Sequence, residues 1–156
     1  MTSRALVATR IGASPERVFE AFTAEIGQWW QPNPLLQSGR SPGGLLSMEP
    51  GPGGRLLEAY GDGSADEIGR VLVWEPPNRL VLSWRPTSFG PGQQTEVHVR
   101  FEPVGDGTRV VVEHLGWDAL PPEHAARHGF PLRDFQFRVA EWWQELLAGL
   151  AAHSAG

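Results

Sequence analysis

The sequence predicts an α+β fold in which a curved antiparallel sheet of six to seven strands surrounds a long C-terminal helix. Three observations predict it. The length of 156 residues suits one domain, spanning 1–156. Short apolar runs alternate with Gly- and Pro-rich turns from residue 45 to residue 115. Residues 134–152 then carry apolar side chains at three- and four-residue spacing, with neither Gly nor Pro before Gly149.

The N-terminal part predicts one strand followed by two short helices. Ala5–Ile11 alternates loosely and is typical of a strand. Ser14 is a suitable N-cap and Pro15 a suitable first helical residue, so a helix is expected to begin there. A second short helix is expected over Glu25–Trp30, ending before Pro32. The apolar face of the first helix consists of Val18, Phe19 and Phe22.

Six further segments predict strands, each joined to the next by a turn. Because neighbouring segments are short and directly linked, an antiparallel meander is expected. The predicted strands are Leu45–Glu49, Arg55–Tyr60, Ile68–Glu75, Leu80–Arg85, Thr95–Glu102 and Thr108–Leu115.

The last segment, Asp134–Ala152, predicts a long amphipathic helix with a large aromatic face. This face must be buried, and in one domain the sheet is the surface available to cover it. A curved sheet contacts one helix closely only at its middle, so we expect a hydrophobic cavity between the two. The apolar face consists of Phe135, Val139, Trp142, Trp143, Leu146, Leu147 and Leu150.

Alternation along the strands predicts which side chains face this interior. In the strand over Leu80–Arg85, the inward residues are Leu80, Leu82 and Trp84. In the strand over Thr95–Glu102, they are Val97, Val99 and Phe101. Val110, Val112 and His114 are assigned inward as well. That last assignment stays open, because Val111 and Leu115 on the opposite face are also apolar.

Composition excludes several classes of function. The net charge is −5, without a basic patch, which argues against nucleic-acid binding. No run approaches the ~18 apolar residues of a membrane-spanning helix, and the N-terminus has no signal-peptide core, so a cytoplasmic location is expected. The chain has no Cys and no Lys, which excludes thiolate nucleophiles, thiolate metal sites and lysine Schiff bases. We expect no cofactor.

Two polar residues are candidates for a directional role inside the cavity. His114 could orient a ligand carbonyl or hydroxyl, or act as a general base; the alternative is a histidine held by structural partners. Glu58 is the acid expected to point inward, where a carboxylate next to His114 would form a pair with perturbed pKa values. Glu67 and Arg70 are three residues apart, which places them on opposite faces of a regular strand.

The predicted ligand site combines these polar groups with an apolar wall, the usual design of a small-molecule pocket. Each Trp in the wall has the alternative role of plain core packing. The predicted wall consists of Trp29, Trp30, Trp84, Phe101, Val112, Val139 and Trp142.

No metal site is predicted. His124 and His128 have the i,i+4 spacing of a zinc pair, but Ala125 stands where the HExxH motif has Glu. A catalytic zinc needs three protein ligands, and no third one follows.

Four segments together carry a family resemblance: Ile11–Phe19, Gln28–Pro32, Pro76–Trp84 and Glu113–Trp117. In their order and spacing the chain resembles the START-like SRPBCC superfamily, most closely the branch named after the activator of the heat-shock-protein-90 ATPase. The resemblance covers nearly the whole chain. It implies a helix-grip fold with an internal pocket for lipids, sterols, polyketides or other apolar molecules. Bacterial stand-alone members of this branch are mostly of unknown function. It transfers no catalytic motif.

The sequence favours a binding module over an enzyme: a small apolar or aromatic molecule would sit between the sheet and the last helix. The second interpretation is a polyketide cyclase/aromatase-like enzyme using His114 as its acid–base group. The third is a co-chaperone-like or stress-related protein-interaction module, although a lone domain argues against chaperone activation. A homodimer through a strand edge or the Trp-rich helix is compatible with the sequence, which does not select it.

Overall fold

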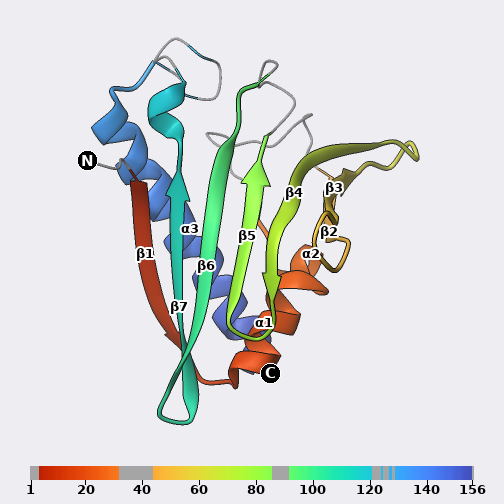
Figure 1. Cartoon of the computed structure of the whole chain (residues 1–156), viewed down its shortest axis with the longest axis vertical. Coiled ribbons are helices and arrows are strands. Elements are labelled where there is room, and N and C mark those ends of the chain that lie inside the picture. The colour runs from red at the N-terminus through yellow and green to blue at the C-terminus, as the bar shows by residue number, and fades with distance from the viewer. Residues whose placement is uncertain are drawn as a thin grey trace.

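The predicted sheet and C-terminal helix are both present in the structure, a computed structural model (Figure 1). It describes residues 4–31, 44–85, 92–120, 124, 127 and 129–155. Within this part of the chain, seven strands form one antiparallel sheet in the order β1-β7-β6-β5-β4-β3-β2. Their bounds are β1 Arg4–Ile11, β2 Leu45–Met48, β3 Arg55–Ala59, β4 Ala65–Glu75, β5 Arg79–Trp84, β6 Thr95–Val104 and β7 Gly107–Leu115.

The helices also match the prediction closely. Helix α1 (Pro15–Thr23) begins where expected, because the Ser14 hydroxyl accepts a hydrogen bond from the Arg17 backbone N–H at 3.2 Å. Helix α2 is shorter than expected (Ile26–Trp29). A 3-10 turn, η2 (Trp117–Ala119), follows β7. Helix α3 (Leu132–Ala155) extends beyond the predicted bounds at both ends.

The core lies between the concave face of the sheet and α3, which runs behind β1, β7 and β6 and ends near α1 (Figure 1). The alternation predicted for β5 and β6 is confirmed, because the residues assigned inward all belong to one core cluster. The open assignment on β7 is settled. Val110, Val112 and His114 face the interior and are fully buried, while Val111 is buried outside the core cluster.

One expectation about strand faces is wrong. Glu67 and Arg70 were expected on opposite faces, yet they form a surface ion pair, with Arg70 Nε 3.0 Å from Glu67 Oε2. The cause is a β-bulge in β4. Leu57 pairs with Glu67 while Leu56 pairs with Gly69, so Ile68 is an extra residue that reverses the alternation. A bulge breaks the period of two on which the expectation rested.

Gly69 is required next to this bulge. A Cβ atom at residue 69 would lie 2.1 Å from the carbonyl oxygen of Ser83 on the neighbouring strand β5. The missing side chain therefore lets the two backbones approach each other at this position.

No helix in the described ranges combines the length and the apolarity that crossing a bilayer requires.

The C-terminal end of α3 is held against the two short helices by charged groups. Glu25, the N-cap residue of α2, lies 2.9 Å from Arg17 of α1 and 2.6 Å from His153 Nε2 of α3. The hydrogen bond from Arg17, reinforced by that from His153, lowers the pKa of Glu25 to about 2. This carboxylate therefore joins three helices.

We expect Glu25→Gln to lower the free energy of unfolding near neutral pH by about 1 kcal/mol, a value suited to a partly exposed ion-pair network. Glu25 has a lower pKa in the folded protein than in the unfolded chain. Its stabilisation is therefore complete above about pH 4.5 and is lost as the pH falls through about 2. Urea unfolding at pH 6 and pH 3 should show the difference between variant and wild type shrinking at pH 3.

Glu20→Gln is the control, because Glu20 also contacts Arg17 but leaves the Glu25–His153 contact in place. An equal loss of stability in both variants, or a difference that grows toward low pH, would contradict the proposed role of Glu25.

Candidate functional site

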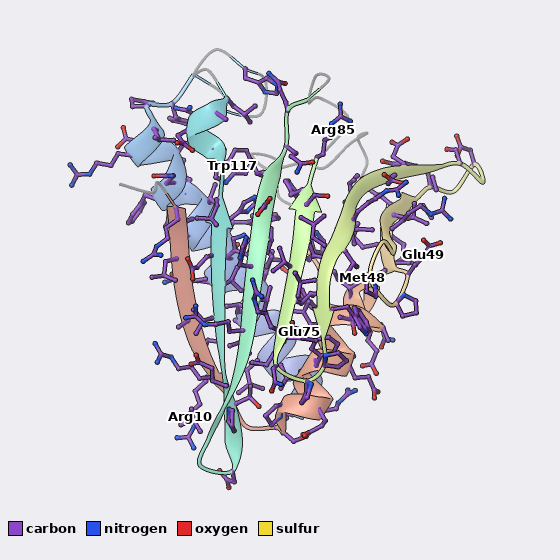
Figure 2. All side chains as sticks on the ribbon, in the orientation of Figure 1. Arg10, Met48, Glu49, Glu75, Arg85 and Trp117 are labelled. Carbon is purple, nitrogen blue, oxygen red and sulfur yellow. The ribbon has the colours of Figure 1, made fainter. Side chains whose placement is uncertain are left out.

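The interior between the sheet and α3 is lined by a cluster of rings from four elements. Trp29 and Trp30 end α2, Trp84 ends β5, His114 lies near the end of β7, and Trp142 and Trp143 occupy the middle of α3. Figure 2 shows Trp117 and Arg85, which follow β7 and β5, at the same end of the sheet. We call Trp29, Trp30, Trp84, His114, Trp142 and Trp143 the indole cluster.

Trp30 is the ring on which the indole cluster converges. Its ring centroid lies 5.7 Å from that of Trp84, 5.4 Å from that of Trp142 and 5.6 Å from that of Trp143. These spacings are typical of favourable aromatic pairs. Trp30 is half-buried, whereas its three neighbours are buried. The indole cluster therefore reaches solvent through Trp30.

His114 is the polar centre of the indole cluster, and its tautomer follows from its partners. The Thr95 hydroxyl donates its single hydrogen to the Trp84 carbonyl oxygen at 3.1 Å, so toward His114 it can only accept. His114 Nε2 therefore carries the proton and donates to Thr95 Oγ1 at 2.9 Å. Nδ1 accepts a hydrogen bond from Trp143 Nε1 at 3.1 Å. A chain of three hydrogen bonds thus runs from α3 through β7 to β6 and β5.

Burial lowers the pKa of His114 to about 3, so the ring is neutral at physiological pH. Both ring nitrogens are engaged with protein groups. A role as an acid or a base would require His114 to release Trp143 or Thr95 first.

Glu58 is buried, as the inward assignment expects, but its bonds lie elsewhere. Its carboxylate accepts the backbone N–H of Gly44 at 2.8 Å and the Tyr60 hydroxyl at 2.9 Å. In the sheet order, strands β6, β5 and β4 separate its strand β3 from β7. The structure gives Glu58 and His114 separate sets of partners.

The remaining predicted wall residues divide into two groups. Phe101 packs against Phe19 and Phe22 of α1, with ring centroids 5.1 and 5.9 Å away, on the side of the core away from His114. Val112 and Val139 belong to the same buried core. The structure thus places four of the predicted tryptophans and His114 in one group of neighbouring rings: Trp29, Trp30, Trp84 and Trp142. Phe101 is connected to this group through Phe22, which contacts both Phe101 and Trp29.

Sequence reasoning missed two residues that determine the state of His114. Thr95 continues the inward alternation of Val97, Val99 and Phe101, and that signal was available in the sequence. Trp143 was identified on the helix face, but its indole N–H could not be matched to a partner without the spatial arrangement. Trp117, whose ring centroid lies 4.8 Å from that of His114, completes the enclosure of the imidazole.

One buried donor in the indole cluster lacks an acceptor within the described ranges. Trp142 is 3% exposed, and its Nε1 finds no hydrogen-bond partner among the described residues. Leaving a buried donor unsatisfied costs about 1–3 kcal/mol. By contrast, Trp29 Nε1 donates to the Ala21 carbonyl oxygen at 2.7 Å.

A groove of about 380 Å³ lies on the outer surface between the start of β1 and the first turns of α3. Its walls include Leu6 and Phe137, which are 48% and 67% exposed. None of the predicted ligand-binding residues lines it, so it is separate from the indole cluster.

The histidine pair considered for zinc is only partly described. His128 lies outside the described residues, and His124 Nε2 bonds to Gln93 Oε1 at 3.0 Å.

Comparison with known proteins agrees with this architecture. A profile of the family described as activator of Hsp90 ATPase homolog 1-like protein matches residues 12–155. The chain belongs to this family. A search of the curated proteins finds no match.

Solved structures with the same fold include three of different description. Protein MLL2253 from Mesorhizobium loti is 19% identical, with a TM-score of 0.66 over 96% of this chain and 94% of that one. The anthrahydroquino-γ-pyrone synthase Txn09, complexed with SUM, is 29% identical, with a TM-score of 0.59 over 96% and 95%. PFC0360w, an HSP90 activator from Plasmodium falciparum, is 19% identical, with a TM-score of 0.64 over 95% and 92%.

We expect His114 to remain neutral, with its proton on Nε2, from pH 7 down to pH 4. Nitrogen NMR of the imidazole should show a protonated Nε2 and an unprotonated Nδ1 across this range. Since the pKa of His114 is lower in the folded protein, its contribution to stability is complete above about pH 6.5. It falls toward about pH 3 by roughly 1.4 kcal/mol per pH unit, because the unfolded chain takes up the proton.

The urea-denatured chain is the internal control, because its imidazole should titrate near the ordinary value of about 6.5. Titration of folded His114 near neutral pH, or a proton on Nδ1, would show that the hydrogen-bond assignment is wrong.

Proposed function

We propose that this protein binds a small apolar or aromatic molecule between the sheet and α3, against the indole cluster. The observation that carries the proposal is the arrangement of Trp30, Trp84, Trp142 and Trp143. Each of these four ring centroids lies within 6 Å of at least two others, and Trp30 is half-buried. Flat, rigid rings with few polar groups provide a large contact area for an apolar ligand at low entropic cost.

The polar groups nearby fit a binding role better than a catalytic one. Both nitrogens of His114 are engaged, and the hydroxyl of Thr95 both accepts and donates. Glu58, the other predicted anchor, is tied to Gly44 and Tyr60. These groups fix the shape of the wall, and the rings supply the contact surface.

A second candidate function is that of a cyclase-like enzyme acting on a polyketide. The observation that favours it is the 29% identity to the synthase Txn09 over nearly the full length of both chains. For this chain, His114 is the candidate acid–base group, and its release from Trp143 or Thr95 would be part of any such mechanism. The homodimer that the sequence permits without selecting it, and the chaperone partner of the third interpretation, stay hypotheses.

We expect the neutral, apolar fluorophore N-phenyl-1-naphthylamine to bind saturably, with energy transfer from tryptophan. Trp30→Ala should weaken this binding by roughly two- to tenfold, the value of one aromatic contact of about 0.5–1.5 kcal/mol. Fluorescence titration of the purified protein measures both quantities. Mass spectrometry of molecules that co-purify with the protein would identify the natural ligand.

Phe137→Ala is the matched control, because Phe137 is an exposed ring on the outer groove of α3. Binding that weakens in Phe137→Ala but not in Trp30→Ala would place the fluorophore in the groove and contradict the proposal. A response without saturation would contradict it as well.

The enzymatic candidate predicts turnover of an aromatic polyketide precursor that is lost in His114→Asn. The Asn side chain can still accept from Trp143 Nε1 but has no atom where Nε2 lies, so the fold should persist. Product formation followed by chromatography, with circular dichroism as the check on folding, tests this. Turnover that survives in the folded variant would exclude His114 as the acid–base group.

A further inference from the structure

The indole of Trp142 is the buried polar group of the indole cluster that lacks a partner in the part of the chain that the structure describes. Its N–H is buried and finds no acceptor among the described residues. Two other indoles are satisfied by the protein itself: Trp29 donates to Ala21, and Trp143 donates to His114. Buried tryptophan N–H groups usually find a partner, so this exception calls for an explanation.

The surroundings of Trp142 are rings. The centroid of Trp143 lies 5.4 Å away, that of Trp30 lies 5.4 Å away at right angles, and that of Trp84 lies 5.9 Å away. A phenylalanine would pack among these rings without burying an unsatisfied donor. An acceptor atom on a bound molecule would instead satisfy the N–H, which would then contribute to ligand recognition.

The neighbouring polar groups restrict what this molecule carries. The chain from Trp143 through His114 and Thr95 to the Trp84 carbonyl uses the nitrogens of His114, the hydroxyl hydrogen of Thr95 and the indole hydrogen of Trp143. Among the buried polar atoms of the indole cluster, the described residues leave one without a partner, the Nε1 donor of Trp142. A ligand with an acceptor oxygen is therefore satisfied, whereas a ligand hydroxyl or amine would bring a buried donor of its own.

We infer that Trp142 Nε1 donates a hydrogen bond to the carbonyl oxygen of a ring-bearing apolar ligand, so that the site selects ketones or quinones over hydrocarbons and alcohols. This inference rests on the proposed ligand-binding function. It adds the chemical class of the ligand and the residue that distinguishes it.

Three tricyclic compounds of the same shape test this selectivity: fluorene, fluorenone and fluorenol, which carry no oxygen, a carbonyl and a hydroxyl. Calorimetric titration of the full-length protein should show fluorenone binding roughly tenfold tighter than fluorene, with fluorenol weaker than fluorenone. In Trp142→Phe the advantage of fluorenone over fluorene should vanish to within roughly twofold. Trp74→Phe, an indole truncation against Phe19 on the α1 side of the core, should retain it.

A second measurement keeps the test decisive if Trp142→Phe folds poorly. In the wild-type proton–nitrogen NMR spectrum, the indole signal of Trp142 should move downfield with fluorenone and not with fluorene.

The outcomes separate the inference from the function on which it rests. Equal affinity of the wild type for fluorene and fluorenone overturns the carbonyl contact but leaves ligand binding in place. The carbonyl contact is also overturned if folded Trp142→Phe still binds fluorenone more tightly than fluorene. The same holds if fluorenone moves the NMR signal of another indole instead of that of Trp142. Binding of neither compound overturns the proposed function together with this inference.

Discussion

The hydrogen bond from Trp143 Nε1 to His114 Nδ1 determines how α3 lies on the sheet. Most of this interface consists of apolar contacts, which are strong in sum but weakly directional. A buried indole N–H that must reach one ring nitrogen is directional, and a shift of α3 by one residue would leave both groups unsatisfied. The bond therefore selects one register of the aromatic face of α3 against the concave side of the sheet.

The same bond also fixes the tautomer of His114, whereas burial fixes its charge. Because Nδ1 accepts from Trp143, the proton of the imidazole lies on Nε2, where Thr95 receives it. Burial then keeps the ring neutral. The indole cluster is therefore an uncharged environment although it contains a histidine, and an apolar molecule can enter it without meeting a buried charge.

The fold could be predicted from the sequence because its signals are local. Ser14 and Pro15 mark the start of α1, and the stripe from Phe135 to Leu150 marks α3; both depend on residues close together in the chain. The error at Glu67 and Arg70 arose where a local rule failed: the bulge at Ile68 shows itself only through the pairing of β3 with β4. The face of β7 was ambiguous for a similar reason, because Val110, Val111 and Val112 are alike until the sheet is assembled.

The candidate site was predictable only in part, because its chemistry depends on pairs that are far apart in the chain. Alternation and helical spacing place His114 and Trp142 in the interior, but they cannot say which polar atom meets which. The outcome differs sharply for groups that look equivalent in the sequence: His114 has two partners, Glu58 is bound on a distant strand, and Trp142 has none among the described residues. Distances between elements decide this, and no single segment encodes them.

This distribution of partners bears on how one fold can support both binding and catalysis. A fold provides the cavity and the wall, whereas function depends on which polar atoms remain open toward a ligand. A histidine with a free nitrogen facing a cavity can move protons directly, whereas His114 must first give up its bond to Trp143 or Thr95. In this chain the titratable group, His114, has both nitrogens engaged. The open buried group is an indole, which donates a hydrogen bond but does not ionise near neutral pH. The open buried group is therefore suited to the recognition of an acceptor atom, which is the role proposed for it above.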